Sequence, residues 1–342
     1  MEQMLRELCA IDGTSGREHA VRAYILDKLN QYPTEKTVTV DPMGNVLVQV
    51  KGQQTPTKRL LFAAHMDEVG LIVTYIEEDG TLRFAAVGGI DEKALFGKRV
   101  RVGDRVGIIG GKAMHQCHGD EKTSVPSIHD MRIDLGCTTK AEAEQYVQAG
   151  DAAYFVGDWV TFGDHKIKAK ALDDRAGCAL LLALAETTPA YDITLAFTVQ
   201  EEVGLRGART AAFSVDPDLA IVVDVTTAAD IAGVGGADRV CCQGGGPVVT
   251  FMDNRTLYDR ELYEQITGLA KSLAMPVQTK SRIAGGNDAG AIQTSRGGVR
   301  IAAISLPGRY IHSSGSVIDR RDLENTATLL SASIAMLLGD AV

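Results

Sequence analysis

The sequence predicts an α/β fold interrupted by an inserted β-rich block. Two observations predict it. Residues 1–69 and 166–342 alternate apolar strand patterns with amphipathic helix patterns, which is typical of a sheet covered by helices. Residues 70–165 instead contain short strand patterns separated by turn signals such as Glu78-Asp79-Gly80, which indicate a small barrel or sandwich. The α/β part is therefore expected to be discontinuous in sequence.

The N-terminal part predicts two helices, a hairpin and a buried strand. Ser15 and Glu18 have the spacing of a capping box before the second helix. Asp41-Pro42-Met43-Gly44 marks the turn of the hairpin. The run that ends at His65 is continuously apolar, as in a strand covered on both faces. The expected ranges are helices 4–12 and 17–31, and strands 37–40, 45–50 and 59–65.

The rest of the chain predicts one helix inside the β-rich block and then further alternation of strand and helix. Thr139 and Glu142 form a capping box for the helix in the block. Glycine-rich turns separate many of the later elements. The expected ranges are helices 140–149, 174–187, 206–213, 260–273, 288–295 and 322–338, and strands 193–199, 219–225, 277–279 and 300–306.

Composition excludes some classes of partner. The chain has 342 residues, of which 45% are hydrophobic and 23% charged, as in an ordinary globular protein. A formal charge of −9 argues against nucleic acid or an anionic membrane as the main partner. No apolar run reaches the roughly 18 residues of a membrane span, and no signal-peptide core is present, so a cytoplasmic location is expected. The six cysteines lack C-x-x-C spacing and are expected to be unpaired.

An apolar strand that starts at Phe197 runs into two adjacent carboxylates and a glycine-rich turn. These carboxylates are Glu201 and Glu202. Neighbours on an extended strand point to opposite faces, so the two glutamates are expected to have different tasks. We interpret Glu201 as a general base and Glu202 as a metal ligand.

Further candidate ligands stand near the ends of other apolar runs. Asp67 follows His65 by two positions, so both side chains leave one face, and Asp67 is the candidate that orients the His65 ring. Asp224 ends a buried strand, where open α/β sheets place their ligands. His312 lies in a loop after a strand, where a plain surface histidine is the alternative.

The pair Asp173-Asp174 opens a helix, where the helix dipole favours negative charge. Helix capping is therefore one interpretation, and bridging two metal ions is the other for Asp173. Asp174 is expected to shape the turn or to pair with Arg175. The whole set offers nitrogen and carboxylate ligands suited to two divalent ions such as zinc, which indicates hydrolysis.

Four motifs of this chain resemble those of the tetrahedral aminopeptidases, a family of glutamyl and deblocking aminopeptidases once labelled cellulases or endoglucanases. Leu172 and Asn287 depart from the family, which often has Phe and Thr there. The motifs are Ala64-His65-Met66-Asp67-Glu68-Val69-Gly70, Ala171-Leu172-Asp173-Asp174-Arg175, Glu201-Glu202-Val203-Gly204-Leu205-Arg206-Gly207 and Gly285-Gly286-Asn287-Asp288-Ala289-Gly290.

The resemblance implies a metallopeptidase that removes N-terminal residues from short peptides with two divalent ions, zinc or cobalt and otherwise manganese. It implies a zinc-peptidase-like catalytic domain with a mixed sheet (1–69 and 166–342) and a small PDZ-like β-barrel for dimerisation (70–165). Dimers would assemble into a hollow tetrahedral dodecamer. The implied roles are ligation of one ion by His65 and Asp224 and of the other by Glu202 and His312, bridging by Asp173, general base for Glu201 and orientation of His65 by Asp67.

Three alternatives remain at the level of sequence. A dinuclear amidohydrolase that deacylates N-acyl or small amide substrates would use the same ligands. A glycoside hydrolase would need two carboxyl groups that converge on the bond, leaves the histidines without a role, and has few aromatic residues here for sugar stacking. A non-catalytic binding protein would have no use for a complete ligand set. The native metal and the preferred N-terminal residue do not follow from the sequence.

Overall fold

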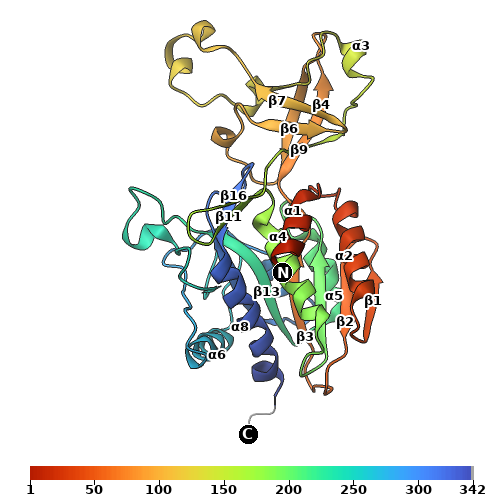
Figure 1. Ribbon diagram of the computed structural model, residues 1–342, viewed down its shortest axis with the longest axis vertical. Helices are drawn as coiled ribbons and strands as arrows, with labels where there is room; N and C mark the ends of the chain where they lie inside the picture. Colours follow the sequence, from red (N-terminus) through yellow and green to blue (C-terminus); the bar gives the residue numbers. More distant parts are fainter. Residues whose placement is uncertain (340–342) are drawn as a thin grey trace.

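The computed structural model describes residues 1–339, which form a helix-covered sheet at one end of the molecule and a closed barrel at the other (Figure 1). The main sheet is mixed: its four central strands run parallel, and the outer strands pair antiparallel. The predicted fold class is confirmed. The strand order is β1 (Lys36–Val40), β2 (Val46–Val50), β12 (Ile193–Thr198), β3 (Leu60–His65), β13 (Leu219–Thr227), β15 (Arg300–Gly308) and β14 (Val248–Val249).

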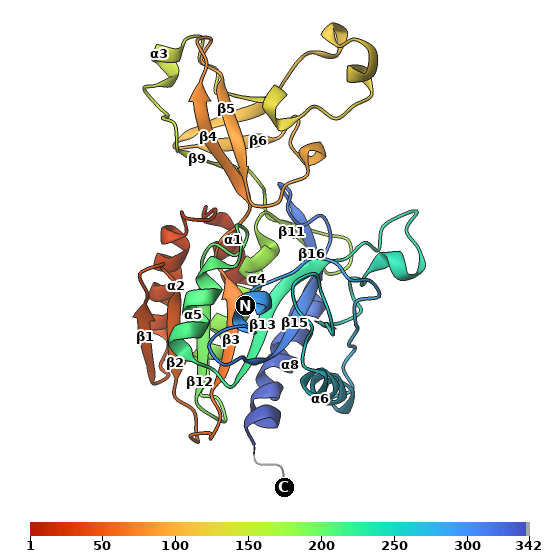
Figure 2. The same ribbon diagram turned by 180° about the vertical axis from the view of Figure 1, so that it is seen from behind.

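Helices cover both faces of this sheet (Figures 1 and 2). The larger group packs its apolar residues with one face of the sheet in a single core. Two shorter helices, α5 (Arg206–Val215) and α7 (Ala289–Ile292), cover the other face. All six residues of β3 are buried, as predicted for a strand covered on both sides. The larger group comprises α1 (Glu2–Ala10), α2 (His19–Gln31), α4 (Leu172–Glu186), α6 (Arg260–Ser272) and α8 (Arg320–Leu338).

The barrel has a hydrophobic core of its own, which includes Leu71, Val100, Ile109 and Ile133. A small helix, α3 (Lys140–Ala143), lies on it. A three-stranded antiparallel sheet that the sequence did not predict pairs two strands that follow the barrel with one that precedes the last helix: β10 (Val160–Phe162), β11 (Lys166–Ala169) and β16 (Ser316–Asp319). The barrel strands, in spatial order, are β4 (Gly70–Ile76), β5 (Leu82–Val87), β8 (Arg132–Asp134), β7 (Arg105–Gly110), β6 (Arg99–Val102) and β9 (Ala152–Phe155).

The capping box predicted for α2 is wrong. The Ser15 hydroxyl donates to the Asp67 carboxylate at 2.6 Å instead of capping the helix. Glu18 stands at the N-cap, and its carboxylate accepts hydrogen bonds from the amides of Gly16 and Gln200. Long-range partners therefore replace the local pairing, and they bind this loop to the region of Glu201.

Other elements differ in length from their predicted ranges. The Thr139 hydroxyl caps α3 as expected, but the helix ends at Ala143. The predicted strand 277–279 is reduced to one bridge between Gln278 and Val248. All six cysteines are unpaired, as predicted. Within residues 1–339, no helix is long and apolar enough to cross a membrane.

Candidate active site

The candidate catalytic side chains meet in a cavity of about 670 Å³ at the carboxyl ends of the parallel strands. The register aligns Thr198 of β12 with His65 of β3, so the segments that follow the two strands start side by side. Each candidate ligand comes from a different segment. His65 ends β3, Asp173 lies at the start of α4, Glu202 follows β12, Asp224 lies in β13, and His312 follows β15.

Asp173 lies between the two histidines. Its Oδ1 is 3.2 Å from Nε2 of His65, and its Oδ2 is 3.5 Å from Nε2 of His312. Its backbone dihedrals are not helical, although it is within the first turn of α4. The two oxygens of one carboxylate therefore face two different imidazoles, which is the arrangement that a bridging ligand needs.

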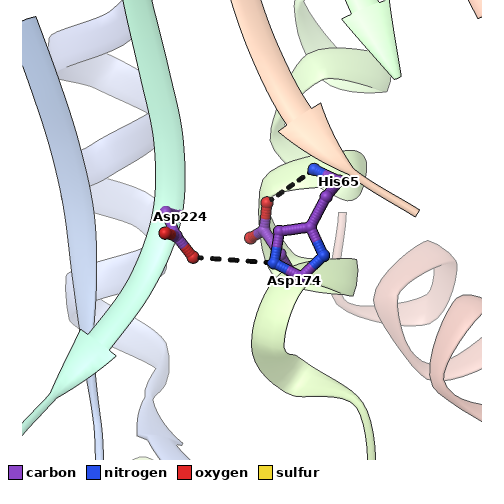
Figure 3. Close-up of side chains that lie close together, drawn as sticks. All are labelled: His65, Asp174 and Asp224. Atoms are coloured by element: carbon purple, nitrogen blue, oxygen red, sulfur yellow. Dashed lines mark hydrogen bonds and ion pairs between the residues drawn. The ribbon is translucent and has the colours of Figure 1, made fainter. Parts of the chain in front are cut away.

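The Asp174 carboxylate accepts hydrogen bonds from two main-chain amides. Its Oδ2 accepts a hydrogen bond from the His65 amide at 3.1 Å, and its Oδ1 accepts one from the Gly177 amide at 2.9 Å. Figure 3 shows Asp174 next to the His65 main chain and Asp224 facing the ring, with Asp224 Oδ1 3.9 Å from Nε2 of His65. Asp174 thus shapes the turn, as predicted. The alternative pairing with Arg175 is wrong, because that guanidinium donates to main-chain carbonyls.

The prediction that Glu201 and Glu202 point to opposite faces is wrong. Strand β12 ends at Thr198 and Gln200 has a φ of 55°, so the strand rule does not apply to the turn that follows. Both glutamates line the cavity, and one oxygen of each lies within 4.8 Å of a His65 ring nitrogen. Glu202 Oε1 is 3.5 Å from Nε2 of His312 and, although buried, accepts no hydrogen bond.

Asp67 contacts both the histidine and the turn. Its main-chain carbonyl lies 3.0 Å from Nδ1 of His65, closer than its carboxylate at 3.5 Å. The carboxylate accepts hydrogen bonds from the amides of Glu201 and Glu202 at 3.0 and 3.2 Å, and from the Ser15 hydroxyl. Asp67 therefore fixes the turn that carries both glutamates, a role that spacing alone did not indicate.

The site holds more buried negative charge than its histidines can balance. Burial, with the nearby Asp173 carboxylate, raises the pKa of Glu202 to about 7 and that of Asp224 well above its usual value. Burial also raises the pKa of Glu201. For His312, burial opposes the charged form, but the carboxylates of Asp173 and Glu202 raise the pKa to about 9. Such crowded carboxylates are the donors that divalent cations bind.

The sequence profile of the M42 glutamyl aminopeptidases matches residues 44–329. The chain belongs to the M42 glutamyl aminopeptidase family. It is therefore an aminopeptidase and a hydrolase of a metallopeptidase family, and the resemblance to the tetrahedral aminopeptidases is confirmed.

Relatives of this M42 chain match it over nearly its whole length. A curated relative from Acetivibrio thermocellus is 38% identical and covers 98% of both chains. The lysyl aminopeptidase of Pyrococcus furiosus is 31% identical over 96% of this chain and 95% of its own. A solved aminopeptidase from the archaeon Desulfurococcus kamchatkensis has a TM-score of 0.92 at 33% identity, covering 99% and 94% of the two chains. A TET peptidase of Pyrococcus horikoshii, which can assemble into a tetrahedron or a large octahedral shell, has a TM-score of 0.84 at 31% identity and 99% coverage of both.

The M42 site also contains residues that sequence analysis did not single out. Gly88 and Gly89 follow barrel strand β5 and leave room for the ligands: a Cβ on Gly88 would lie 3.2 Å from Cβ of Glu202, and one on Gly89 would lie 3.5 Å from Nδ1 of His312. In the sequence, this pair of glycines indicates only a turn. Asn287 and Asp288 of the motif at 285–290 were candidates for the pocket wall: Asn287 lines the cavity, whereas Asp288 is buried, accepts a hydrogen bond from the Thr198 hydroxyl at 2.6 Å, and has its pKa raised to about 6 by burial.

Proposed function

We propose that this chain removes N-terminal residues from short peptides by metal-dependent hydrolysis, with Glu201 as the general base. The position of Asp173 carries the proposal, because its two oxygens face His65 and His312. Asp224 and Glu202 complete the two sides of this arrangement.

The residues present fit two divalent ions. We propose that His65 and Asp224 hold one ion, that Glu202 and His312 hold the other, and that Asp173 bridges them. Oε1 of Glu202 supports this: it is buried and accepts no hydrogen bond, its ion-pair neighbour is the His312 ring at 3.5 Å, and such an oxygen is costly to bury unless a cation binds it. When bound, two such metal ions lower the pKa of a water molecule and polarise the scissile carbonyl. Zinc, cobalt and manganese all suit this donor set.

Proton transfer is carried out by the chain's own side chains. The Glu201 carboxylate takes a proton from the attacking water and delivers it to the leaving nitrogen. In the metal-free chain burial raises the pKa of this carboxyl, and a general base needs a pKa near the working pH. The hydrogen bonds from the amides of Glu201 and Glu202 to Asp67 keep the base and the ligand in place.

Hydrolysis of aminoacyl-anilides before and after metal removal tests the proposal. Release that disappears with chelator and returns with zinc, cobalt or manganese is the expected result. N-acetylated substrates form the second arm of the panel. Cleavage of the acetylated set alone would contradict the aminopeptidase mechanism and favour the deacylase alternative.

We further propose that residues 70–165 form an inserted dimerisation domain and that dimers build a tetrahedral dodecamer. The barrel has its own core and presents apolar side chains to solvent, with Val106 54% and Ile108 48% exposed. The assembly of the Pyrococcus horikoshii relative supports the dodecamer. Light scattering should give a mass near twelve chains, and V106E/I108E should lower it. A monomer in the unmodified protein would contradict the proposal.

A further inference from the structure

An asparagine that the proposed mechanism does not use lies in the wall of the catalytic cavity. Asn287 belongs to the glycine-rich segment 285–290 and lines the same cavity as His65 and Glu201. It is only 5% exposed, so the protein encloses most of its side chain. A buried amide is costly unless its polar atoms have partners, so the hydrogen bonds of Asn287 show which of its atoms await a ligand.

The oxygen of this amide is used by the protein. Asn287 Oδ1 accepts a hydrogen bond from the Ala289 main-chain amide at 3.0 Å. It also lies 3.2 Å from the Tyr258 hydroxyl, which donates to the Asp253 carboxylate at 2.6 Å. Because a main-chain N–H can only donate, the oxygen has to face Ala289, and this fixes which way the amide is turned.

The nitrogen of the amide is left for a ligand. Within residues 1–339, Asn287 Nδ2 donates to no protein acceptor. Nor is it one of the polar atoms that are closed off from solvent without a partner, as Oδ1 of Asp288 is. The nitrogen therefore faces the cavity with its N–H groups unused. Such a donor suits a ligand that presents an oxygen acceptor.

The segment of Asn287 is held at the strand end that also leads to the proposed base. The neighbouring Asp288 accepts a hydrogen bond from the Thr198 hydroxyl at 2.6 Å. Thr198 is the last residue of β12 and lies opposite His65 in the register, and the turn that carries Glu201 follows it. The amide donor and the base are therefore positioned from one strand end, where both can act on one carbonyl group.

The proposed reaction creates an oxygen that needs such a donor. When water adds to the scissile carbonyl, the π electrons of the C=O bond move onto its oxygen, which becomes negative. They return when the bond to the leaving nitrogen breaks. The carboxylates of Asp173, Glu202 and Asp224 in the wall can only accept hydrogen bonds. A neutral amide can donate, and a donor that is already held in place needs no reorganisation at that moment.

We infer that Asn287 is a catalytic residue whose Nδ2 donates a hydrogen bond to the oxygen of the scissile carbonyl as this oxygen becomes negative. The inference rests on the proposed function. Asn287 is also a position at which this chain departs from the tetrahedral aminopeptidases, which often have Thr there. A threonine hydroxyl is a donor as well, so the same role is open to either side chain.

The variant that tests this role is N287D, which keeps an oxygen for the Ala289 amide and replaces the donor by an acceptor of the same shape. In the metal-loaded enzyme, its kcat for Leu- and Ala-anilides should fall about 10- to 100-fold with little change in KM. N287A should lose a similar factor, and N287T should retain most of the activity. N30A, on the exposed side of α2, is the matched control. Unchanged kcat in N287A would overturn the inference, because the loss in N287D would then come from the added charge.

Inhibitor binding separates this role from a structural one. The α-aminophosphonic acid analogue of leucine has a tetrahedral, negatively charged centre, whereas leucinol has the same amine and side chain but no negative oxygen. Calorimetry with the metal-loaded protein should show that N287A weakens binding of the phosphonic acid and leaves binding of leucinol nearly unchanged. Equal weakening of both would mean that Asn287 only shapes the cavity, which would refute this inference alone. If N287A does not fold, N287D serves in both measurements. No hydrolysis of any free-amine substrate by the unmodified enzyme would instead refute the proposed function.

Discussion

Two neighbouring groups of buried charges differ in how they are balanced. The site cluster comprises His65, Asp173, Glu201, Glu202 and Asp224, in which acids outnumber bases. The balanced cluster comprises Asp12, Glu68, Lys170 and Arg175. There the Lys170 ammonium lies 2.6 Å from Glu68 and 3.2 Å from Asp12. We infer that the balanced cluster stabilises the fold and that the site cluster is arranged for a ligand.

The largest expected effect is a loss of activity without a loss of stability at the site cluster. E201Q should lower kcat by about 10²- to 10⁴-fold, because the general base is lost while the shape is kept. Bound metal and melting temperature should stay close to those of the parent, as measured by elemental analysis and calorimetry. E264Q, on the exposed face of α6, is the control. Unchanged kcat would remove Glu201 from the mechanism.

At the balanced cluster the effect should fall on stability instead. K170M removes the cation nearest the buried Glu68 carboxylate and leaves only the more distant Arg175 at 3.7 Å, so the free energy of unfolding should fall by about 3–5 kcal/mol. Denaturant titration measures this, with the exposed K271M as a control that should change by less than about 0.5 kcal/mol. A similar loss in both variants would mean that the balanced cluster does not contribute as proposed.

The pH dependence of the metal-free protein should reveal the crowding at Glu202. Its pKa is raised from 4.5 to about 7 in the folded state. The folded protein therefore binds this proton more tightly than the unfolded chain, so the associated stability is complete below about pH 4.5 and is lost as the pH rises through about 7. E202Q should flatten this slope in thermal melts, and identical slopes would contradict the shift.

Metal should reverse the sign of this dependence, because binding requires the deprotonated carboxylate and imidazole. The His312 pKa of about 9 acts in the same direction as that of Glu202. Metal affinity, measured by competition with a chelator, should therefore fall as the pH decreases.

The smallest expected effect lies at the link between the N-terminal loop and the site. S15A removes the hydroxyl that donates to Asp67 at 2.6 Å but leaves the amides of Glu201 and Glu202 on the same carboxylate. Stability should fall by about 1–2 kcal/mol and kcat only a few-fold. A loss as large as that of E201Q would mean that Ser15, and not the two amides, holds Asp67.

Features that depend on strand geometry could be predicted from the sequence. The buried strands and the placement of His65 and Asp224 toward their carboxyl ends followed from apolar runs, because parallel strands of one sheet end at a common edge, although β13 and β15 each run two residues beyond their predicted ends. The directions of Glu201 and Glu202 did not follow, since the chain leaves the strand at Thr198 and the turn sets them. The contacts of Ser15 with Asp67 and of Glu18 with Gln200 join segments far apart in sequence, where spacing carries no information.

One consequence of Gly88 and Gly89 concerns the independence of the barrel. An insertion can often be deleted or exchanged between relatives, because it meets its host only through two linkers. Here the turn after β5 contributes Gly89 and Asp91 to the cavity wall, beside His312. Any graft that replaces the barrel would also rebuild one wall of the site, so the two parts of this chain have to change together.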